Sequence, residues 1–390
     1  MKTIVIISTM RFVNNNSAGV NRMQKYARIF ISKGVRVIFA SLLEFNQDAT
    51  LLELFPGTLT FYSPRSSNTN FKDQKYKIIN FLKTLTKNVN YEKNVLFLVY
   101  PSTYNLFDVL VVLYLKIIKG YRVFFEANEV RKYTIRSKGP YGILKYISYS
   151  LSEIFLYFYN GIICISESIE KYYSNYNKKN IRIPILTDSS SEVVLKYFYS
   201  QNEAFNIALA GTIDVEKENL KVFLLSIRIL SDRGYKIKFN LFGKVSDLEK
   251  SKLYHLIKML NLNSVVVLCG EVPYDKLQDK LQENNLLVLP RKPTKQNQLG
   301  FSTKLSDYIQ ACVPVLLTDV SDNLKYIEAS VSGIVADYNS EFDFADKISY
   351  LIDNYNSLAP TITKNANEVA MSHFHFSNYT SKLYDFLFNE

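Results

Sequence analysis

Residues 286–317 read LLVLPRKPTKQNQLGFSTKLSDYIQACVPVLL, and this stretch contains the pattern that decides the fold. An apolar run at 286–289 leads into a polar loop, a helical stretch extends to about Ala311, and a second apolar run follows at 313–317. Short apolar runs joined through a helix are typical of parallel strands in an α/β sheet. The stretch therefore predicts one strand–helix–strand unit of such a sheet.

The same alternation repeats in both halves of the chain. In the first half we expect a helix over 18–32 and strands at 3–7, 35–39, 95–100, 122–125 and 161–165. In the second half we expect helices that start near 219, 247, 274, 301 and 322, and strands at 206–210, 236–242, 265–268, 286–289 and 313–317. Both halves are therefore predicted to be doubly wound, Rossmann-like domains that face each other across a cleft.

The predicted domain boundaries follow from the composition of the linking segment. The segment 187–204 has three serines at 189–191 and no clear apolar period before 193–199, so we place the junction there. We expect an N-terminal domain over 1–190 and a C-terminal domain over 200–365. The remaining residues, 366–390, contain a final helix that we expect to cross back to the first domain.

The composition is that of a folded protein and argues against several functional classes. Hydrophobic residues make up 47% of the 390 residues and charged residues 21%, which is unlike a disordered chain. The 47 Lys and Arg against 36 Asp and Glu give a net charge of +11, which favours an anionic partner. The basic residues are spread along the chain without a nucleic-acid-binding motif, so we expect no nucleic-acid partner.

Few residues suit a metal, a disulfide or a membrane span. The three cysteines stand far apart, and His373 and His375 form the only close histidine pair, so we predict no metal site. The N-terminal MKTIVIIS is too short for a secretory signal. Polar and charged residues interrupt the most apolar long stretch, 95–118. We therefore expect a cytoplasmic location.

One loop and helix start carry the clearest binding chemistry: Gly300, Phe301, Ser302, Thr303, Lys304 and Asp307. Gly300 lets a ligand approach the backbone, and the next three amides would be free at the start of a helix. Lys304 adds a positive charge, and Asp307 is placed to accept hydrogen bonds from ribose hydroxyls. This pattern suits a nucleoside diphosphate, and it equally suits an amphipathic helix with a solvated Lys304–Asp307 pair.

Residues 299–319, LGFSTKLSDYIQACVPVLLTD, resemble the donor-binding segment of glycosyltransferase family 4, whose members are retaining enzymes of the GT-B fold. The match rests on Gly300, Phe301, Thr303, Lys304, Asp307, Tyr308, Ala311, Pro314 and Val315. Ser302 replaces a proline, and Leu299 stands where the family usually has its first glutamate. The resemblance implies transfer of a sugar from a nucleoside-diphosphate sugar to a hydroxyl, without a metal or other cofactor.

Residues 208–220, ALAGTIDVEKENL, resemble the family's glycine loop after a strand. The resemblance implies donor contacts at Gly211 and Thr212 and a catalytic lysine at Lys217. Thr212 occupies a position where arginine is common, and Glu218 one where glycine is common. The charge on the leaving diphosphate would then rest on Lys304, Lys217 and backbone dipoles.

Two segments of the first half complete the resemblance. Residues 17–22, SAGVNR, resemble the family's glycine loop, which implies an acceptor or phosphate loop at Ala18, Gly19 and Arg22. Residues 124–133, FFEANEVRKY, follow a strand and imply contacts near the reacting sugar from Glu126, Asn128 and Glu129.

The implied acceptor is a glycan or polyprenyl-linked sugar, used for capsule, O-antigen or another bacterial surface polysaccharide. Residues 131–159 join a basic segment to an apolar helix. They predict either a peripheral contact with acidic lipid at the inner face of the plasma membrane or a core helix beside an ordinary basic loop.

Two other functions stay open. A non-catalytic partner subunit would explain Thr212 and Leu299, and a nucleotide-sugar epimerase would share the paired sheets.

Overall fold

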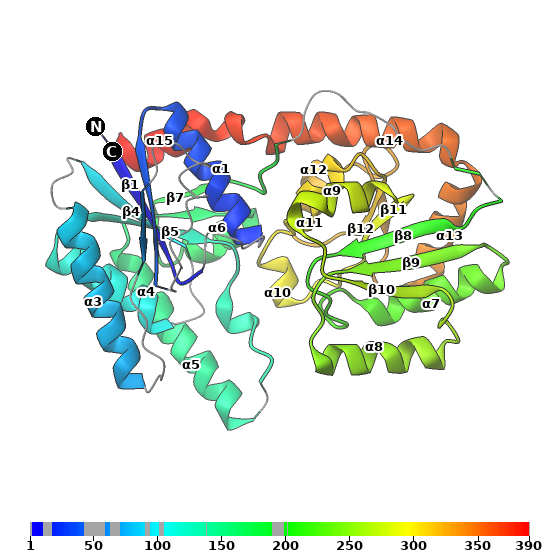
Figure 1. Ribbon diagram of the computed structural model, residues 1–390, viewed down its shortest axis with the longest axis horizontal. Helices are drawn as coiled ribbons and strands as arrows, with labels where there is room; N and C mark the ends of the chain where they lie inside the picture. The colour runs from blue at the N-terminus through cyan, green and yellow to red at the C-terminus, as the bar shows by residue number, and fades with distance from the viewer. Residues whose placement is uncertain are drawn as a thin grey trace. The chain divides into compact units, whose positions relative to one another are not determined.

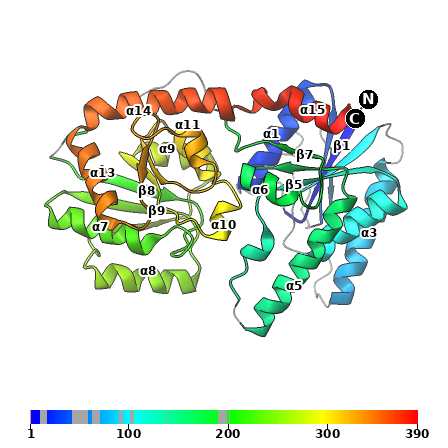
Figure 2. The same cartoon turned by 180° about the vertical axis from the view of Figure 1, so that it is seen from behind.

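The computed structural model describes residues 2–10, 18–42, 59–62, 71–89, 94–100, 105–137, 139–188, 199–200 and 202–389 (Figures 1 and 2). The chain divides into two compact units. We call Met1–Pro184 with Phe376–Glu390 the first unit, and Ile185–His375 the second unit. Within the segment 187–204, where we expected the junction, residues 189–198 and 201 lie outside the described residues.

In the described part of the first unit, seven parallel strands form one sheet, in the order β3-β2-β1-β4-β5-β6-β7. Their bounds are Thr3–Ser8 (β1), Arg36–Ser41 (β2), Leu59–Tyr62 (β3), Val95–Val99 (β4), Arg122–Ala127 (β5), Gly161–Cys164 (β6) and Asn180–Arg182 (β7). The helices are Ala18–Ser32 (α1), Phe71–Val89 (α3), Asn105–Val112 (α4), Pro140–Ile154 (α5), Glu167–Tyr173 (α6) and Thr380–Phe388 (α15). Short helical turns lie at Leu113–Ile118 (η1), Arg131–Tyr133 (η2), Phe155–Phe158 (η3) and Phe376–Tyr379 (η5).

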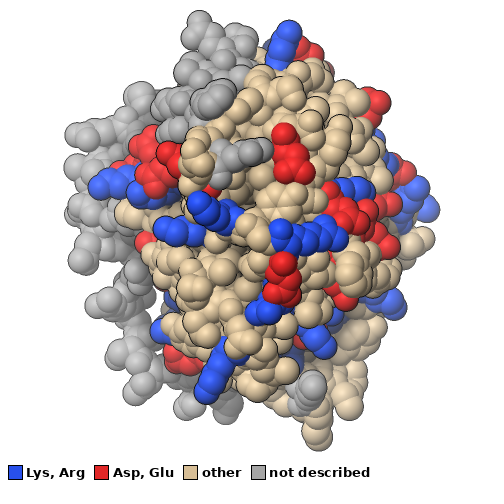
Figure 3. Space-filling view, turned by 90° about the vertical axis from the view of Figure 1, so that its right-hand side faces the viewer, with Lys and Arg blue, Asp and Glu red and all other residues tan. Residues whose placement is uncertain are grey.

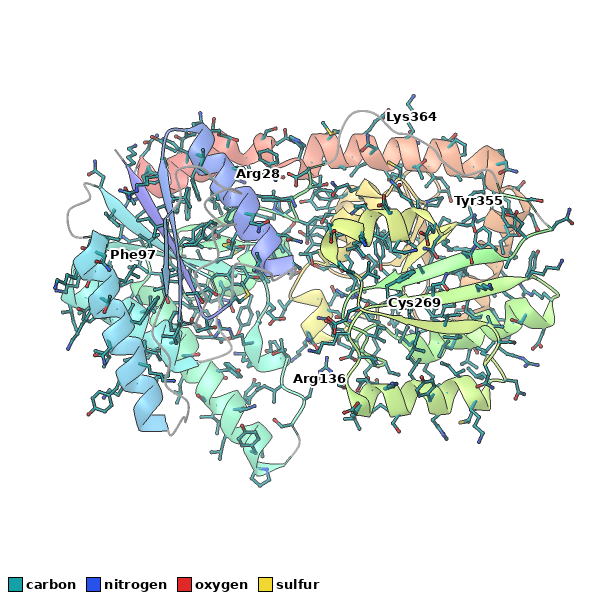
Figure 4. All side chains as sticks on the ribbon, viewed as in Figure 1. Arg28, Phe97, Arg136, Cys269, Tyr355 and Lys364 are labelled. Atoms are coloured by element: carbon teal, nitrogen blue, oxygen red, sulfur yellow. The ribbon has the colours of Figure 1, made fainter. Side chains whose placement is uncertain are left out.

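Helices cover both faces of this first sheet. The helix α1 contacts α15 on one face, and α3, α4 and α5 lie on the other (Figure 1). Phe97 on β4, labelled in Figure 4, is fully buried and packs edge-on against Tyr121 with ring centroids 5.1 Å apart. A parallel sheet covered on both faces needs apolar residues at consecutive positions, so its strands appear as apolar runs in the sequence.

Six parallel strands form the sheet of the second unit, in the order β10-β9-β8-β11-β12-β13. Their bounds are Phe205–Ala210 (β8), Ile237–Phe242 (β9), Val266–Gly270 (β10), Leu286–Leu289 (β11), Val315–Thr318 (β12) and Ile334–Ala336 (β13). The helices are Leu220–Asp232 (α7), Asp247–Met259 (α8), Tyr274–Gln282 (α9), Lys295–Gln298 (α10), Lys304–Gln310 (α11), Asn323–Tyr326 (α12), Glu341–Asp353 (α13) and Tyr355–Val369 (α14). A helical turn follows at Ala370–Phe374 (η4).

The helix α7 shows how the second core forms. Its apolar residues Phe223, Ile227 and Leu230 recur at helical spacing and are fully buried. The Phe223 ring meets Phe239 of β9 at 5.0 Å and Phe344 of α13 at 5.5 Å between ring centroids. Aromatic contacts of this kind therefore join the sheet to the α7 and α13 layer.

The predicted α/β class, with two doubly wound parallel sheets, is confirmed. The sequence prediction omitted β3, β7 and β13, and it began the helix near 301 too early, since α11 starts at Lys304. In each sheet the strand order reverses beside the first strand, between β1 and β4 and between β8 and β11. Such switch points are where open α/β sheets bind ligands, at the carboxyl ends of the strands.

The surface and the helices carry two further observations. On the face shown in Figure 3, Lys and Arg side chains are interspersed with Asp and Glu instead of forming one patch. Among the described residues, no helix combines the length and apolar character needed to span a bilayer.

Candidate functional site

The switch point of the second sheet brings together loops that are far apart in sequence. The strands β8 and β11 are hydrogen-bonded neighbours, and both are almost entirely buried. Gly211 follows β8 directly, and Arg291 lies two residues after the end of β11. The helix α11 begins with Lys304, close to both loops. Residues from three separate segments therefore surround the carboxyl ends of two adjacent strands.

Gly211 leaves the space that the Lys304 side chain occupies. Its φ of +103° is a backbone conformation that L side chains rarely adopt. A Cβ atom there would lie 2.8 Å from Cε and 3.5 Å from Nζ of Lys304. Glycine is therefore required at this position both by the backbone conformation and by the lysine that covers it.

A buried carboxylate pairs with two cations beside this glycine. The Glu218 side chain is 1% exposed, and Arg291 donates to both of its oxygens, from Nη2 to Oε1 at 2.8 Å and from Nε to Oε2 at 3.1 Å. The Lys304 ammonium lies 3.0 Å from Oε1 of the same carboxylate. Such a bidentate pair fixes the orientation of the carboxylate.

Burial and charge together set the protonation of this cluster. Burial alone would raise the pKa of Glu218, but Arg291 and Lys304 hold it well below its usual range. Burial lowers the pKa of Lys304 to about 8, a shift that Glu218 opposes and that Arg291 and Lys217 reinforce. Lys217 is close enough to Lys304 to affect its pKa, so three cations and one carboxylate share this region, and the excess of positive charge suits an anionic ligand.

The loops around the cluster are held by hydrogen bonds from the same unit. The Tyr308 hydroxyl on α11 accepts a hydrogen bond from the backbone N–H of Ala210 at 2.8 Å, which ties α11 to the end of β8. The Asn297 amide donates to the backbone carbonyl of Lys217 at 2.9 Å, and the Lys217 N–H donates to Asp214 Oδ1 at 2.8 Å. These contacts therefore hold α11 against the end of β8 and fix the backbone of the loop that carries Lys217.

The loop before α11 differs from the prediction. We expected free helix-start amides at Phe301, Ser302 and Thr303, but Thr303 is the residue that precedes the helix. The Phe301 ring instead stacks on Tyr326 at 5.7 Å and meets Phe374 at 6.0 Å. These aromatic contacts hold the loop outside the helix, so α11 begins later than the glycine suggested.

Other predicted donor residues border the same loops. Thr212 is exposed just after Gly211, and Ser302 is 8% exposed. The carbonyl of Gly300 accepts a hydrogen bond from the Ser321 hydroxyl. Asp307 is half-buried, and its backbone carbonyl accepts a hydrogen bond from the Gln278 amide at 3.3 Å.

In the first unit, Arg22 and Glu126 form a buried ion pair instead of facing solvent. Arg22 Nε lies 2.6 Å from Glu126 Oε1, and the two side chains are 3% and 0% exposed. Arg22 Nη2 also donates to the Tyr26 hydroxyl at 2.7 Å and to the carbonyl of Ile183 at 2.6 Å, and Nη1 donates to the carbonyl of Pro184. These contacts engage the guanidinium on every side, so its role in this structure is to tie α1 to β5 and to the segment after β7.

Tyr100 lies beside two of the remaining predicted residues of the first unit, Asn128 and Gly19. Its hydroxyl accepts a hydrogen bond from the Asn128 amide at 2.6 Å, and a Cβ atom at Gly19 would lie 2.4 Å from that hydroxyl oxygen. Gly19 therefore allows the start of α1 to approach Tyr100, while Ala18 beside it is exposed. Glu129 is exposed, in contrast to Glu126.

Sequence reasoning missed two residues of the charged cluster, Glu218 and Arg291. Glu218 was recognised only as a departure from a glycine, and Arg291 was not singled out. A basic residue directly after a buried strand at a switch point is the signal that would have found Arg291. Within the residues that the structure describes, no cluster of three or more His, Cys, Asp and Glu side chains is arranged to hold a metal ion.

Comparison with protein families finds a match to part of the second unit. Residues 204–354 match the family model "Glycosyl transferases group 1", and this range contains every residue of the charged cluster. No curated protein sequence matches the chain significantly.

Solved structures share the fold over the whole chain. Sucrose-phosphate synthase from Thermosynechococcus elongatus is 13% identical with a TM-score of 0.74, and the match covers 100% of both chains. The Anabaena protein HepE, in complex with UDP-glucose, is 13% identical with a TM-score of 0.73 and the same coverage. WaaG, a glycosyltransferase involved in lipopolysaccharide biosynthesis, is 12% identical with a TM-score of 0.68, also over 100% of both chains. The fold is therefore GT-B, as predicted.

Proposed function

We propose that this GT-B protein is a glycosyltransferase that moves a sugar from a nucleoside-diphosphate sugar to a hydroxyl group. The observation that carries the proposal is the cluster of Lys304, Arg291 and Glu218 beside Gly211, at the switch point of the second sheet. The match of residues 204–354 to the group 1 glycosyltransferase model supports this assignment. The UDP-glucose complex of HepE supports a nucleotide sugar as the donor.

The chemistry follows from where the positive charge lies. When the bond to the sugar breaks, negative charge develops on the departing diphosphate, and cations already in place stabilise it without reorganising. Lys304 and Lys217 are the side chains that we assign to this role. Gly211 and Gly300 line the same loops, and Thr212, Phe301, Ser302, Thr303 and Asp307 complete the proposed donor site. We propose a retaining reaction without a metal, because the loop resembles family 4.

The first unit would supply the acceptor contacts. Because Arg22 and Glu126 are committed to each other, we assign Glu129 and Asn128 to the hydroxyls of the sugar or acceptor. Ala18 and Gly19 border the same switch point at the start of α1. The acceptor that we propose is a glycan or a polyprenyl-linked sugar in surface-polysaccharide synthesis, which the resemblance implies and the likeness to WaaG supports.

The exposed face of α5 and η3 supports a peripheral contact with acidic lipid. Its large apolar side chains are between 43% and 64% exposed: Tyr141, Ile143, Leu144, Tyr146, Ile147, Leu151, Ile154, Tyr157 and Phe158. The charged residues of α5 are Lys145, whose ammonium lies over the Tyr141 ring at 4.6 Å, and Glu153, which is buried against Lys132. Arg136, labelled in Figure 4, is exposed on the segment before this helix. An apolar face flanked by cations suits an anionic bilayer surface.

Vesicle flotation tests this contact. The protein should float with phosphatidylglycerol vesicles and not with phosphatidylcholine vesicles, and the double variant Leu144→Glu/Ile147→Glu should stay at the bottom. Leu248→Glu on α8 is the matched control, because Leu248 is 66% exposed outside the proposed surface. Equal flotation of the double variant and the wild type would contradict the lipid contact.

A panel of nucleotide sugars tests the proposed function against its alternatives. The purified protein is incubated with each donor, and the products are separated by chromatography. Slow release of a nucleoside diphosphate supports the transferase. Epimerised nucleotide sugar would instead indicate an epimerase, and no product with no thermal shift would indicate a non-catalytic partner subunit.

A further inference from the structure

The position of Glu218 needs an explanation, because a carboxylate at the centre of a diphosphate site repels the ligand. Glu218 is 1% exposed and lies 3.0 Å from Lys304, the cation that we assign to the diphosphate. A buried carboxylate is costly unless it is paired. The presence of Glu218 therefore indicates that it acts on Lys304 and not on the donor.

We propose that Glu218 is a positioning residue, which holds the Lys304 ammonium charged and directed over Gly211 until the donor phosphate replaces it as partner. This inference rests on the proposed function, because it deepens the role of the same site. Geometry supports it, since the Lys304 chain passes over the bare backbone of Gly211 before its ammonium reaches Glu218 Oε1.

Arg291 makes such an exchange of partners feasible. It donates to both oxygens of Glu218, at 2.8 and 3.1 Å, so the carboxylate stays paired after Lys304 turns to the donor. A bidentate guanidinium also keeps the carboxylate ionised and fixed in one orientation. Without Arg291, release of Lys304 would leave a buried charge alone, which is strongly unfavourable.

The charges that face Lys304 come from two loops. Arg291 lies on the loop after β11, and Glu218 and Lys217 lie on the loop after β8. Burial and the two cations all favour the neutral amine, so Glu218 is the group that opposes them. Removing the carboxylate should therefore lower the pKa of Lys304 further.

The neighbouring Glu216 provides a matched control. It lies two residues earlier in the same loop and also pairs with a lysine, Lys292 at 2.9 Å, but its side chain is 72% exposed. An exposed pair of this kind contributes little because water screens it. Glu216→Gln thus makes the same chemical change without touching Lys304.

The test is a direct titration of Lys304 by NMR in the ligand-free protein. The Nζ signals of isotopically labelled lysines are followed from pH 6 to 11, and Lys304→Arg identifies the signal. We expect a midpoint near 8 in the wild type. In Glu218→Gln it should fall by about one pH unit or more, and in Glu216→Gln it should not move. An unchanged midpoint in Glu218→Gln would overturn the proposal.

A second variant covers the case in which Glu218→Gln does not fold. Glu218→Asp keeps a carboxylate for Arg291 but withdraws it by one methylene, so the Lys304 midpoint should shift in the same direction by a smaller amount. A midpoint equal to that of the wild type in this variant would also count against the proposal.

Titration with UDP and the other nucleoside diphosphates then separates the two ideas. If Lys304 shifts as expected but the wild type binds none of these nucleotides, the positioning role stands and the proposed function fails. If the wild type binds UDP and Lys304 does not shift in the Glu218 variants, the proposed function stands and the positioning role fails.

Discussion

Gly211→Ala should damage both stability and donor binding, because two structural demands meet at this glycine. A backbone φ of +103° is unfavourable for alanine, at a cost of about 1–2 kcal/mol. The new Cβ would also lie 2.8 Å from Lys304 Cε, closer than atoms in contact allow. Because Cε lies near the end of a flexible side chain, the lysine would move aside, and its buried pair with Glu218 would be weakened.

Gly234→Ala is the control that separates the contact with Lys304 from the backbone cost. Gly234 has a φ of +87°, and no atom lies within 4 Å of the position that its Cβ would take. It therefore shares the backbone cost without crowding a neighbour. Gly211→Ala should lose about 1–3 kcal/mol more unfolding free energy than Gly234→Ala in urea denaturation, because displacing Lys304 weakens its buried pair with Glu218. It should also weaken nucleoside-diphosphate binding at least tenfold by calorimetry, because Lys304 is displaced.

Equal stabilities of the two variants, together with unchanged nucleotide affinity in Gly211→Ala, would refute the placement of Lys304 over Gly211. A loss of stability with full affinity would show that the lysine is displaced without consequence for the ligand. Either result would remove Lys304 from the proposed diphosphate site.

Two further predictions follow from the charged groups. Arg22→Leu should lower the unfolding free energy by about 3–5 kcal/mol, because it leaves Glu126 buried without its cation, and urea denaturation measures this. The control is Lys171→Gln, which breaks an ion pair with Glu167 whose lysine is 76% exposed, and it should change the unfolding free energy by about 0–1 kcal/mol. A similar loss in both variants would contradict the structural role of Arg22. Nucleoside-diphosphate affinity should fall as pH rises through about 8, where Lys304 loses its proton, and it should then decline by up to about tenfold per pH unit. Calorimetry at pH 7 and 9.5 measures this, and equal affinities would exclude Lys304 as a charged contact.

Most of the predicted strands could be found because they are runs of apolar residues, although β9, IKFNLF, alternates apolar and polar positions. Two of the missed strands lack an apolar run of that length. β7 spans Asn180–Arg182, and all three of its residues are only half-buried. β13 spans only Ile334–Ala336, too short for a periodic pattern to register. Both lie at the edges of their sheets. At an edge, the neighbouring strand determines the pairing more than the residues of the edge strand do.

The start of α11 could not be predicted from local signals. Gly300 suggested a helix start, but Phe301 packs on Tyr326 and Phe374, which are distant in sequence. These tertiary contacts keep the loop out of the helix. Local propensity is a weak guide where a large aromatic side chain finds a partner elsewhere in the fold.

The candidate site was predictable in part, for a similar reason. Lys304 and Gly211 belong to local motifs and were found, whereas the Glu218–Arg291 pair joins residues separated by 73 positions. Only the neighbouring positions of β8 and β11 bring them together. Arg22 was predicted in an acceptor or phosphate loop and Glu126 near the reacting sugar, and local sequence gave no sign that the fold pairs them across 104 positions.

Calorimetric titration of UDP, and of other nucleoside diphosphates, onto the wild-type protein and Lys304→Ala tests most directly whether Lys304 binds the donor diphosphate. We expect one site per chain in the wild type and at least a tenfold loss of affinity in the variant, with unchanged thermal unfolding. Equal affinity in the two proteins would contradict the assignment of Lys304 to the donor diphosphate. Failure of every nucleoside diphosphate to bind the wild type would contradict the proposed glycosyltransferase itself.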